Sequence, residues 1–166
     1  MDMDALFDQM QAAIERIDHP RFFETERGFQ GELRAQLERQ AFRALMPEGS
    51  VIEQEYQKRL QDHGLTIRPD IIIHEPFDPK RHKDRTEGNV AVIELKLNAN
   101  GGEAVADFVN LIRMMDILHY PVGLFINIAS PDTHAALVPS DGRGRIACFS
   151  TMLCDGRPRV LRERTA

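Results

Sequence analysis

Three ionisable residues in two apolar segments have the types and spacing needed to hydrolyse a phosphodiester bond. Glu94 and Lys96 lie two positions apart in an otherwise apolar run, and Asp70 precedes the β-branched residues 71–73. Because side chains alternate across a strand, Glu94 and Lys96 project from the same face. A charged pair in an apolar strand is costly unless it meets partners or a metal. Asp70, on a neighbouring predicted strand, is the expected partner.

The carboxylates of Asp70 and Glu94 are expected to bind a divalent cation, which removes the repulsion between them. Oxygen-only ligands favour a hard ion, so we expect Mg²⁺, with Mn²⁺ as a substitute, rather than Zn²⁺. Such an ion polarises a phosphoryl oxygen and lowers the pKa of a bound water. The Lys96 ammonium is suited to orienting that water and offsetting negative charge in the transition state. Two alternatives are a solvent-facing Glu-x-Lys pair and a turn role for Asp70.

The elements that position these residues are predicted from hydrophobic periodicity and turn signals. The predicted helices span residues 2–17, 28–45 and 103–119, and the predicted strands span 50–58, 68–74, 90–97 and 122–129. A terminal hairpin over 145–162 turns at Asp155-Gly156. With no repeat or linker in the chain, this order predicts a single α/β domain over residues 1–166. Its N-terminal helix lies within residues 1–20.

Two segments resemble the signature of the PD-(D/E)xK nuclease superfamily. They are Arg-Pro-Asp70-Ile-Ile-Ile and Val-Ile-Glu94-Leu-Lys96-Leu. The resemblance implies a restriction-endonuclease-like αβββαβ core over about residues 28–129, with an extra N-terminal helix and a C-terminal β-hairpin. It also implies that Asp70 and Glu94 are metal ligands and that Lys96 orients the water. Most members act on DNA, so the implied activity is Mg²⁺-dependent cleavage of nucleic acid, with DNA favoured over RNA.

Many members of that superfamily, including archaeal Holliday-junction resolvases, carry a further glutamate on the helix before the sheet, in a Gly-x-x-x-Glu pattern. Gly28 and Glu32 reproduce this spacing. The resemblance therefore implies that Glu32 is a third metal ligand and part of the catalytic site. From the residues alone, Glu32 is equally well explained as an exposed helical glutamate.

Two groups of polar residues are candidates for contact with nucleic acid. Lys80, Arg81, Lys83 and Arg85 lie in a charged segment between the two catalytic strands, where a flap would contact phosphates. On the third predicted helix, Asp107, Asn110 and Arg113 recur every three residues opposite the apolar row, and Asn110 and Arg113 are expected near the substrate. The alternative for both groups, and for the basic segment 157–164, is a solvated surface.

Composition excludes several classes of protein. The net charge of −5 argues against a general nucleic-acid coating protein, although it permits an enzyme with local basic residues. No run of about 18 apolar residues is present, so no membrane span is expected. There is no phosphate-binding Gly-rich loop and no zinc-ligand spacing. The acidic first ten residues and the two cysteines, Cys148 and Cys154, indicate a cytoplasmic protein with reduced thiols.

The sequence is also compatible with two non-catalytic functions. A non-catalytic member of the same fold would serve as a binding or assembly module in a larger complex. Alternatively, the apolar stripe of the first helix, from Met3 to Ile17, would dock on another subunit. A homodimer is also expected, because two chains with one active site each suit the cleavage of both strands of a duplex, and twofold dimers are common. That stripe or the edge of the terminal hairpin would supply the contact.

Overall fold

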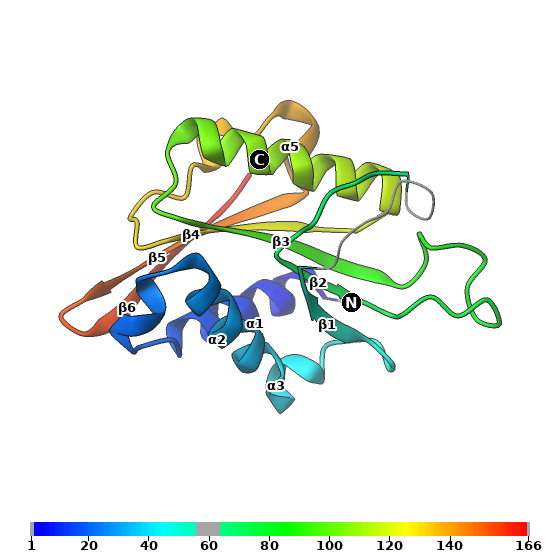
Figure 1. The fold of residues 1–166 in the computed structure, drawn as a ribbon, viewed down its shortest axis with the longest axis horizontal. Coiled ribbons are helices and arrows are strands. Elements are labelled where there is room, and N and C mark those ends of the chain that lie inside the picture. The colour runs from blue at the N-terminus through cyan, green and yellow to red at the C-terminus, as the bar shows by residue number, and fades with distance from the viewer. Residues whose placement is uncertain (1, 56–63, 166) are drawn as a thin grey trace.

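The computed structural model describes residues 2–55 and 64–165, which form an α/β fold around a six-stranded mixed sheet (Figure 1). The strands lie side by side in chain order. Their bounds are β1 Val51–Gln54, β2 Ile71–His74, β3 Asn89–Leu97, β4 Gly123–Ile128, β5 Ile146–Cys154 and β6 Arg157–Arg164. β3, β4 and β5 run parallel, and the remaining neighbours pair antiparallel.

Helices cover both faces of the sheet. On one face lie α1 (Met3–Glu15), α2 (Glu26–Leu37) and α3 (Gln40–Arg43), and on the other lies α5 (Gly101–Leu118). Short 3₁₀ helices are η1 (Pro20–Phe23), η2 (Ala135–Leu137) and η3 (Ser140–Gly142). The central strands are apolar on both faces because each face is covered. Two hydrophobic cores result, one on each side of the sheet.

The strands and helices that position the candidate site meet at one end of the sheet. β3, β4 and β5 all finish there, and we call it the carboxyl end of the sheet. α2 and α5 both begin at this end, on opposite faces (Figure 1). The loop over residues 75–88, between β2 and β3, leads into the start of β3 and therefore lies at the opposite end of the sheet.

The second predicted helix, 28–45, is wrong at both ends. The helix begins at Glu26, because the Thr25 side chain caps it by accepting a hydrogen bond from the Gly28 N–H at 3.0 Å. It ends at Leu37, and the short α3 follows after a break that carries no glycine or proline. The break turns the chain so that Phe42 is fully buried in the core under α1 and α2.

Several strand boundaries also differ from the predictions. β1 ends at Gln54, because Glu55 has a φ of 49°, outside the extended region, and residues 56–58 of the predicted strand lie outside the described residues. β2 begins only at Ile71, after the Pro69-Asp70 pair. β3 and β4 match the predicted strands to within one residue at each end.

The terminal hairpin is confirmed, and it is longer than predicted. Cys154 pairs with Arg157, which leaves Asp155 and Gly156 as a two-residue turn with φ values of 53° and 73°. Positive φ at both positions is the requirement of a type I′ turn, which matches the twist of the strands. β6 continues to Arg164 and forms one edge of the sheet.

The apolar stripe of the first helix is buried within the chain itself. Its residues pack on α2, α3, β5 and β6; they are Leu6, Phe7, Met10, Ala13 and Ile14. The stripe therefore cannot dock on another subunit or supply a dimer contact without unpacking the core, so that expectation was wrong. No helix in the described part of the chain is long and apolar enough to cross a membrane.

Candidate active site

Asp70 is held in place by hydrogen bonds from three different elements. Its Oδ2 accepts from the Leu95 N–H in β3 at 2.7 Å. Its backbone oxygen accepts from the side chain of the buried Gln30 in α2 at 2.6 Å and from the Glu55 N–H at 2.9 Å. Asp70 is thus fixed at the start of β2, against the C-terminal half of β3.

Glu94 lies beside Asp70 and is only 6% exposed. Burial raises the Glu94 pKa well above its usual value, and the negative charges of Asp70 and Asp107 raise it further. Burial also raises the Asp70 pKa, although the hydrogen bonds from Leu95 and Glu94 oppose that rise. The two carboxyl groups are hydrogen-bonded to each other, so without a cation the pair retains a proton more readily than free carboxyls do.

Lys96 projects from the same face of β3 as Glu94, as strand alternation predicts. Its ammonium nitrogen lies 3.9 Å from Asp107 Oδ2 and 4.0 Å from Glu26 Oε1. Burial lowers the Lys96 pKa, but the surrounding carboxylates outweigh burial and raise it above the ordinary value. Lys96 is therefore a charged ammonium, one third exposed and surrounded by acidic groups.

Glu26, the first residue of α2, is a site residue that sequence reasoning missed. Its carboxylate accepts a hydrogen bond from the Leu97 N–H at the end of β3 and faces Lys96. Burial raises its pKa, and Asp70 contributes to the same rise. The signal was available in the sequence, because recognising Thr25 as the helix cap places Glu26 and the buried Gln30 four residues apart on one face.

Asp107, in the second turn of α5, is the other residue that was missed. It is 7% exposed, and its Oδ2 is buried without a hydrogen-bond partner among the described residues. Burial raises the Asp107 pKa to about 6, opposed by Lys96 and reinforced by Asp70. The reading of this helical row as a solvated face is thus wrong for Asp107. Its spacing from the buried Ala104 and Leu111 was the available signal.

Glu32 lies away from this cluster. It is half-buried, and its Oε1 accepts a hydrogen bond from Gln36 one turn later at 2.7 Å. Two residues rotate a helix by about 200°, so Glu32 points away from the face on which Gln30 reaches Asp70. Gly28 also has a local explanation, since an added Cβ would lie 2.8 Å from the capping oxygen of Thr25. The Gly-x-x-x-Glu spacing therefore does not bring Glu32 to the site.

The candidate contacts to nucleic acid are also separated from the site. Lys80, Arg81, Lys83 and Arg85 lie in the loop at the opposite end of the sheet (Figure 1). The run of β3 from Asn89 to Lys96 puts about 23 Å between that end and the ammonium. Arg81 pairs with Glu75 at 3.1 Å, and Arg85 stacks over Phe77.

On α5, the two other candidates lie progressively further from the site. Asn110 is half-buried one turn beyond Asp107, and Arg113 is exposed two turns beyond it, about 9 Å along the axis. Asn110 is thus close enough to approach a bound substrate, whereas Arg113 requires a substrate that extends along the helix. Both roles stay predictions.

The donors around Lys96 suit a hard cation. All are carboxylate oxygens, and Asp107 Oδ2 accepts no hydrogen bond among the described residues, so the hydrogen-bonding capacity of the cluster is incompletely used. No group of three or more His, Cys, Asp or Glu within residues 2–55 and 64–165 is arranged to hold a metal as it stands. Glu26 and Asp107 instead face the Lys96 ammonium, and the neighbouring Asp70 and Glu94 carboxyls have raised pKa values because they are buried.

Comparison of the chain with protein-family models, with curated proteins and with solved structures found no match in any of the three. The site consists of four carboxylates and one lysine gathered at the carboxyl end of a mixed sheet.

Proposed function

We propose that this chain is a Mg²⁺-dependent nuclease that hydrolyses phosphodiester bonds in nucleic acid, with DNA the favoured substrate. One observation carries the proposal. The Lys96 ammonium lies within 4.0 Å of two carboxylates and on the same strand face as Glu94, whose carboxyl is hydrogen-bonded to Asp70. Acidic oxygens can hold a hard cation and a fixed positive charge can stabilise the transition state, and both suit the metal-dependent hydrolysis of a phosphodiester.

The proposed metal ligands are Glu26, Asp70 and Glu94, so Glu26 takes the role that the resemblance implied for Glu32. A bound Mg²⁺ supplies a Lewis acid for the phosphoryl oxygen and acidifies a coordinated water. The fold of the chain holds the proposed ligands in place. Asp70 is fixed by the Leu95 N–H and by Gln30, and Glu26 by the Leu97 N–H. Rigid support of this kind keeps ligands in a productive geometry.

Lys96 is proposed to act on the nucleophilic water and on the developing negative charge. Its ammonium is one third exposed and lies 3.9 Å from Asp107 Oδ2 and 4.0 Å from Glu26 Oε1. Asp107 is proposed as a positioning residue, because it lies on α5 and draws the ammonium toward the centre of the site. The raised pKa of Lys96 keeps it protonated at neutral pH, as this role demands.

The restriction-endonuclease-like fold is part of the same proposal. Two observations support it: apart from the four-residue α3, the succession α2, β1, β2, β3, α5 and β4 follows the αβββαβ order, and the proposed metal ligands come from the first turn of α2, the position before β2, and β3. In this arrangement α1 and the β5–β6 hairpin are additions to the core, with α1 in contact with α2 and β5 paired to β4. The proposed Mg²⁺ site lies where β2 begins and β3 ends.

The test is a cleavage panel with Mg²⁺, Mn²⁺, Ca²⁺ or EDTA, across linear, circular, branched and single-stranded DNA and a matched RNA. We expect Mg²⁺-dependent cleavage by the wild type, none by Asp70→Asn, and cleavage about 10²- to 10³-fold slower by Lys96→Ala. The matched control is Lys80→Ala, which removes an exposed lysine at the opposite end of the sheet and should leave cleavage unchanged. Absence of cleavage on every substrate, with nucleic-acid binding retained, would instead favour the non-catalytic binding module.

A further inference from the structure

The β5–β6 hairpin carries arginines in two different situations. Arg162 and Arg164 face α1 and form ion pairs with Asp8 at 2.7 Å and Asp4 at 2.5 Å. Arg157 and Arg159, nearer the turn, are exposed and form no ion pair or side-chain hydrogen bond among the described residues. The inner arginines thus fasten the hairpin to α1, while the outer two are available for a partner.

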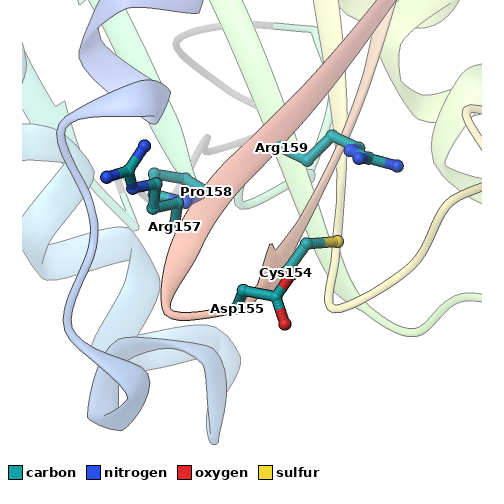
Figure 2. A pocket seen from close by; sticks show the side chains of 5 residues that line it. All are labelled: Cys154, Asp155, Arg157, Pro158 and Arg159. Atoms are coloured by element: carbon teal, nitrogen blue, oxygen red, sulfur yellow. The ribbon is translucent and has the colours of Figure 1, made fainter.

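The two unpaired arginines, Arg157 and Arg159, lie on either side of the hairpin tip. Together with Cys154, Asp155 and Pro158 they line a shallow hollow of about 510 Å³. Figure 2 shows the Arg159 guanidinium extending beside Cys154 on one side of the hairpin, and the Arg157 guanidinium extending on the other side. Two cationic groups on either side of a narrow tip suit a chain of anions that passes across it, rather than one small anion.

The hairpin tip lies at the same end of the sheet as the acidic cluster. β5 runs parallel to β3, so its final residue, Cys154, points to the carboxyl end where Lys96 lies (Figure 1). The strand register connects Lys96 to Asn127, then to Ser150 and then to Leu161, and Arg159 is two residues further toward the tip.

The distance between Lys96 and the hairpin tip can be spanned by a few nucleotides of a DNA strand. Three strand spacings of about 4.8 Å and two residues along β6 place Arg159 about 16 Å from Lys96. One strand of B-DNA carries a phosphate every 3.4 Å or so of axial rise. A backbone with its scissile phosphate at Lys96 therefore reaches the hairpin tip about five nucleotides away.

We propose that Arg157 and Arg159 form a second contact site for the phosphate backbone of duplex DNA, about 16 Å from the reacting phosphate. This inference rests on the proposed function for the identity of the ligand. It replaces the loop over residues 80–85 as the basic surface that works with the acidic cluster. Phosphate contacts of this kind position a duplex without reading its sequence.

The experiment compares two double variants with equal changes of charge. Arg157→Gln/Arg159→Gln alters the hairpin tip, and Lys80→Gln/Lys83→Gln alters exposed lysines at the opposite end of the sheet. Binding of a fluorescein-labelled duplex of about 20 base pairs is measured by anisotropy at about 100 mM NaCl with Mg²⁺. A Lys96→Ala background slows turnover about 10²- to 10³-fold, so that the duplex stays intact during the measurement.

We expect the hairpin variant to weaken binding at least about tenfold and to reduce the slope of log K against log salt by about 0.9 per arginine. The lysine variant should change neither quantity. In the active background the hairpin variant should raise KM and leave kcat within about twofold, since both arginines are remote from the reacting phosphate. Both variants should melt within about 2 °C of wild type, because all four positions are exposed.

Three results would overturn the inference. They are equal affinity of the hairpin variant and its parent, equal losses in the two double variants, and a fall in kcat with KM unchanged. These outcomes are separable from failure of the proposed function. Cleavage by a wild type whose hairpin variant binds normally refutes only the second contact site. A wild type that binds through the hairpin and cleaves nothing refutes only the nuclease activity.

Discussion

Lys96 is the residue whose removal tests the chemistry most directly. Lys96→Ala should reduce kcat about 10²- to 10³-fold, the loss typical of one electrostatic group that acts on a transition state. The fold should survive, because the ammonium is one third exposed and its partners are carboxylates that metal can still neutralise. Single-turnover cleavage, with circular dichroism as the fold control, measures both effects. Activity within threefold of wild type would remove Lys96 from the mechanism.

Glu26 and Glu32 form a matched pair on one helix. Glu26→Gln should raise the Mg²⁺ concentration for half-maximal activity about tenfold or more, since it weakens a proposed ligand. Glu32→Gln should leave the metal titration within about twofold, because Glu32 contacts Gln36 rather than the acidic cluster. A Mg²⁺ titration of cleavage rate separates them. The reversed pattern would restore Glu32 as the third ligand.

At the scale of single residues, sequence reasoning located the β-strand part of the site. Asp70, Glu94 and Lys96 come together because side chains alternate along a strand and because β2 pairs with β3. Both features could be predicted from the apolar runs in the sequence. The helical contributions of Glu26 and Asp107 were missed. Successive side chains on a helix point in directions about 100° apart. An error of two or three residues in the start of a helix, or in its buried face, therefore assigns the wrong side chain to the site.

The N-terminus of α2 couples local helix stability to the metal site. Thr25 caps the helix through the Gly28 N–H, and the next residue is Glu26. Thr25→Ala should cost about 1 kcal/mol in unfolding free energy and lower Tm by about 2–4 °C. It should also raise the Mg²⁺ requirement, since the first turn that carries Glu26 loses its anchor.

The control for this prediction is the cap of α1. Asp2 accepts hydrogen bonds from Asp4 and Ala5, and α1 begins away from the acidic cluster. Asp2→Ala should therefore produce a similar loss of Tm with an unchanged metal titration. If both variants shift the titration equally, the effect reflects global stability, and Glu26 needs no capped helix to act.

At the scale of elements, β3, β4 and the hairpin were predictable because their signals are local. Long apolar runs and an Asp-Gly turn determine them with little help from the rest of the fold. The break after Leu37 was not predictable, since residues 38 and 39 carry no breaker and the bend serves the burial of Phe42. The 75–88 loop directly precedes β3, so its place at the amino end of that strand, away from Lys96, was predictable; the antiparallel pairing of β2 with β3 is what brings Asp70 to the carboxyl end of β3.

At the scale of the whole molecule, the gathering of four carboxylates at one end of the sheet lowers the stability of the metal-free protein. The pKa values of Glu26, Asp70 and Glu94 are raised, and that of Asp107 is raised to about 6. A carboxyl with a raised pKa in the folded state binds protons that the unfolded chain has already released. Between about pH 4 and pH 6 the folded state therefore holds more protons than the unfolded state.

The metal-free protein should consequently lose stability as pH rises through that window, because unfolding releases the retained protons. Asp107→Asn should flatten this dependence and raise the metal-free unfolding free energy at pH 7 by about 1–3 kcal/mol, since it removes a charge that burial disfavours. Mg²⁺ should oppose the loss in the wild type, adding about 2.7 kcal/mol at a hundredfold excess over its Kd.

Urea unfolding in EDTA and in Mg²⁺, at several pH values between about 4 and 8, measures these terms together. Asp18→Asn, an exposed carboxylate change outside the cluster, is the control and should leave the pH dependence unaltered. A metal-free wild type whose unfolding free energy stays constant or rises from about pH 4 to pH 7 would contradict the prediction. In that case the attraction of Lys96 for its carboxylate neighbours exceeds their burial cost, and the cluster is a stabilising ion-pair network rather than a strained metal site.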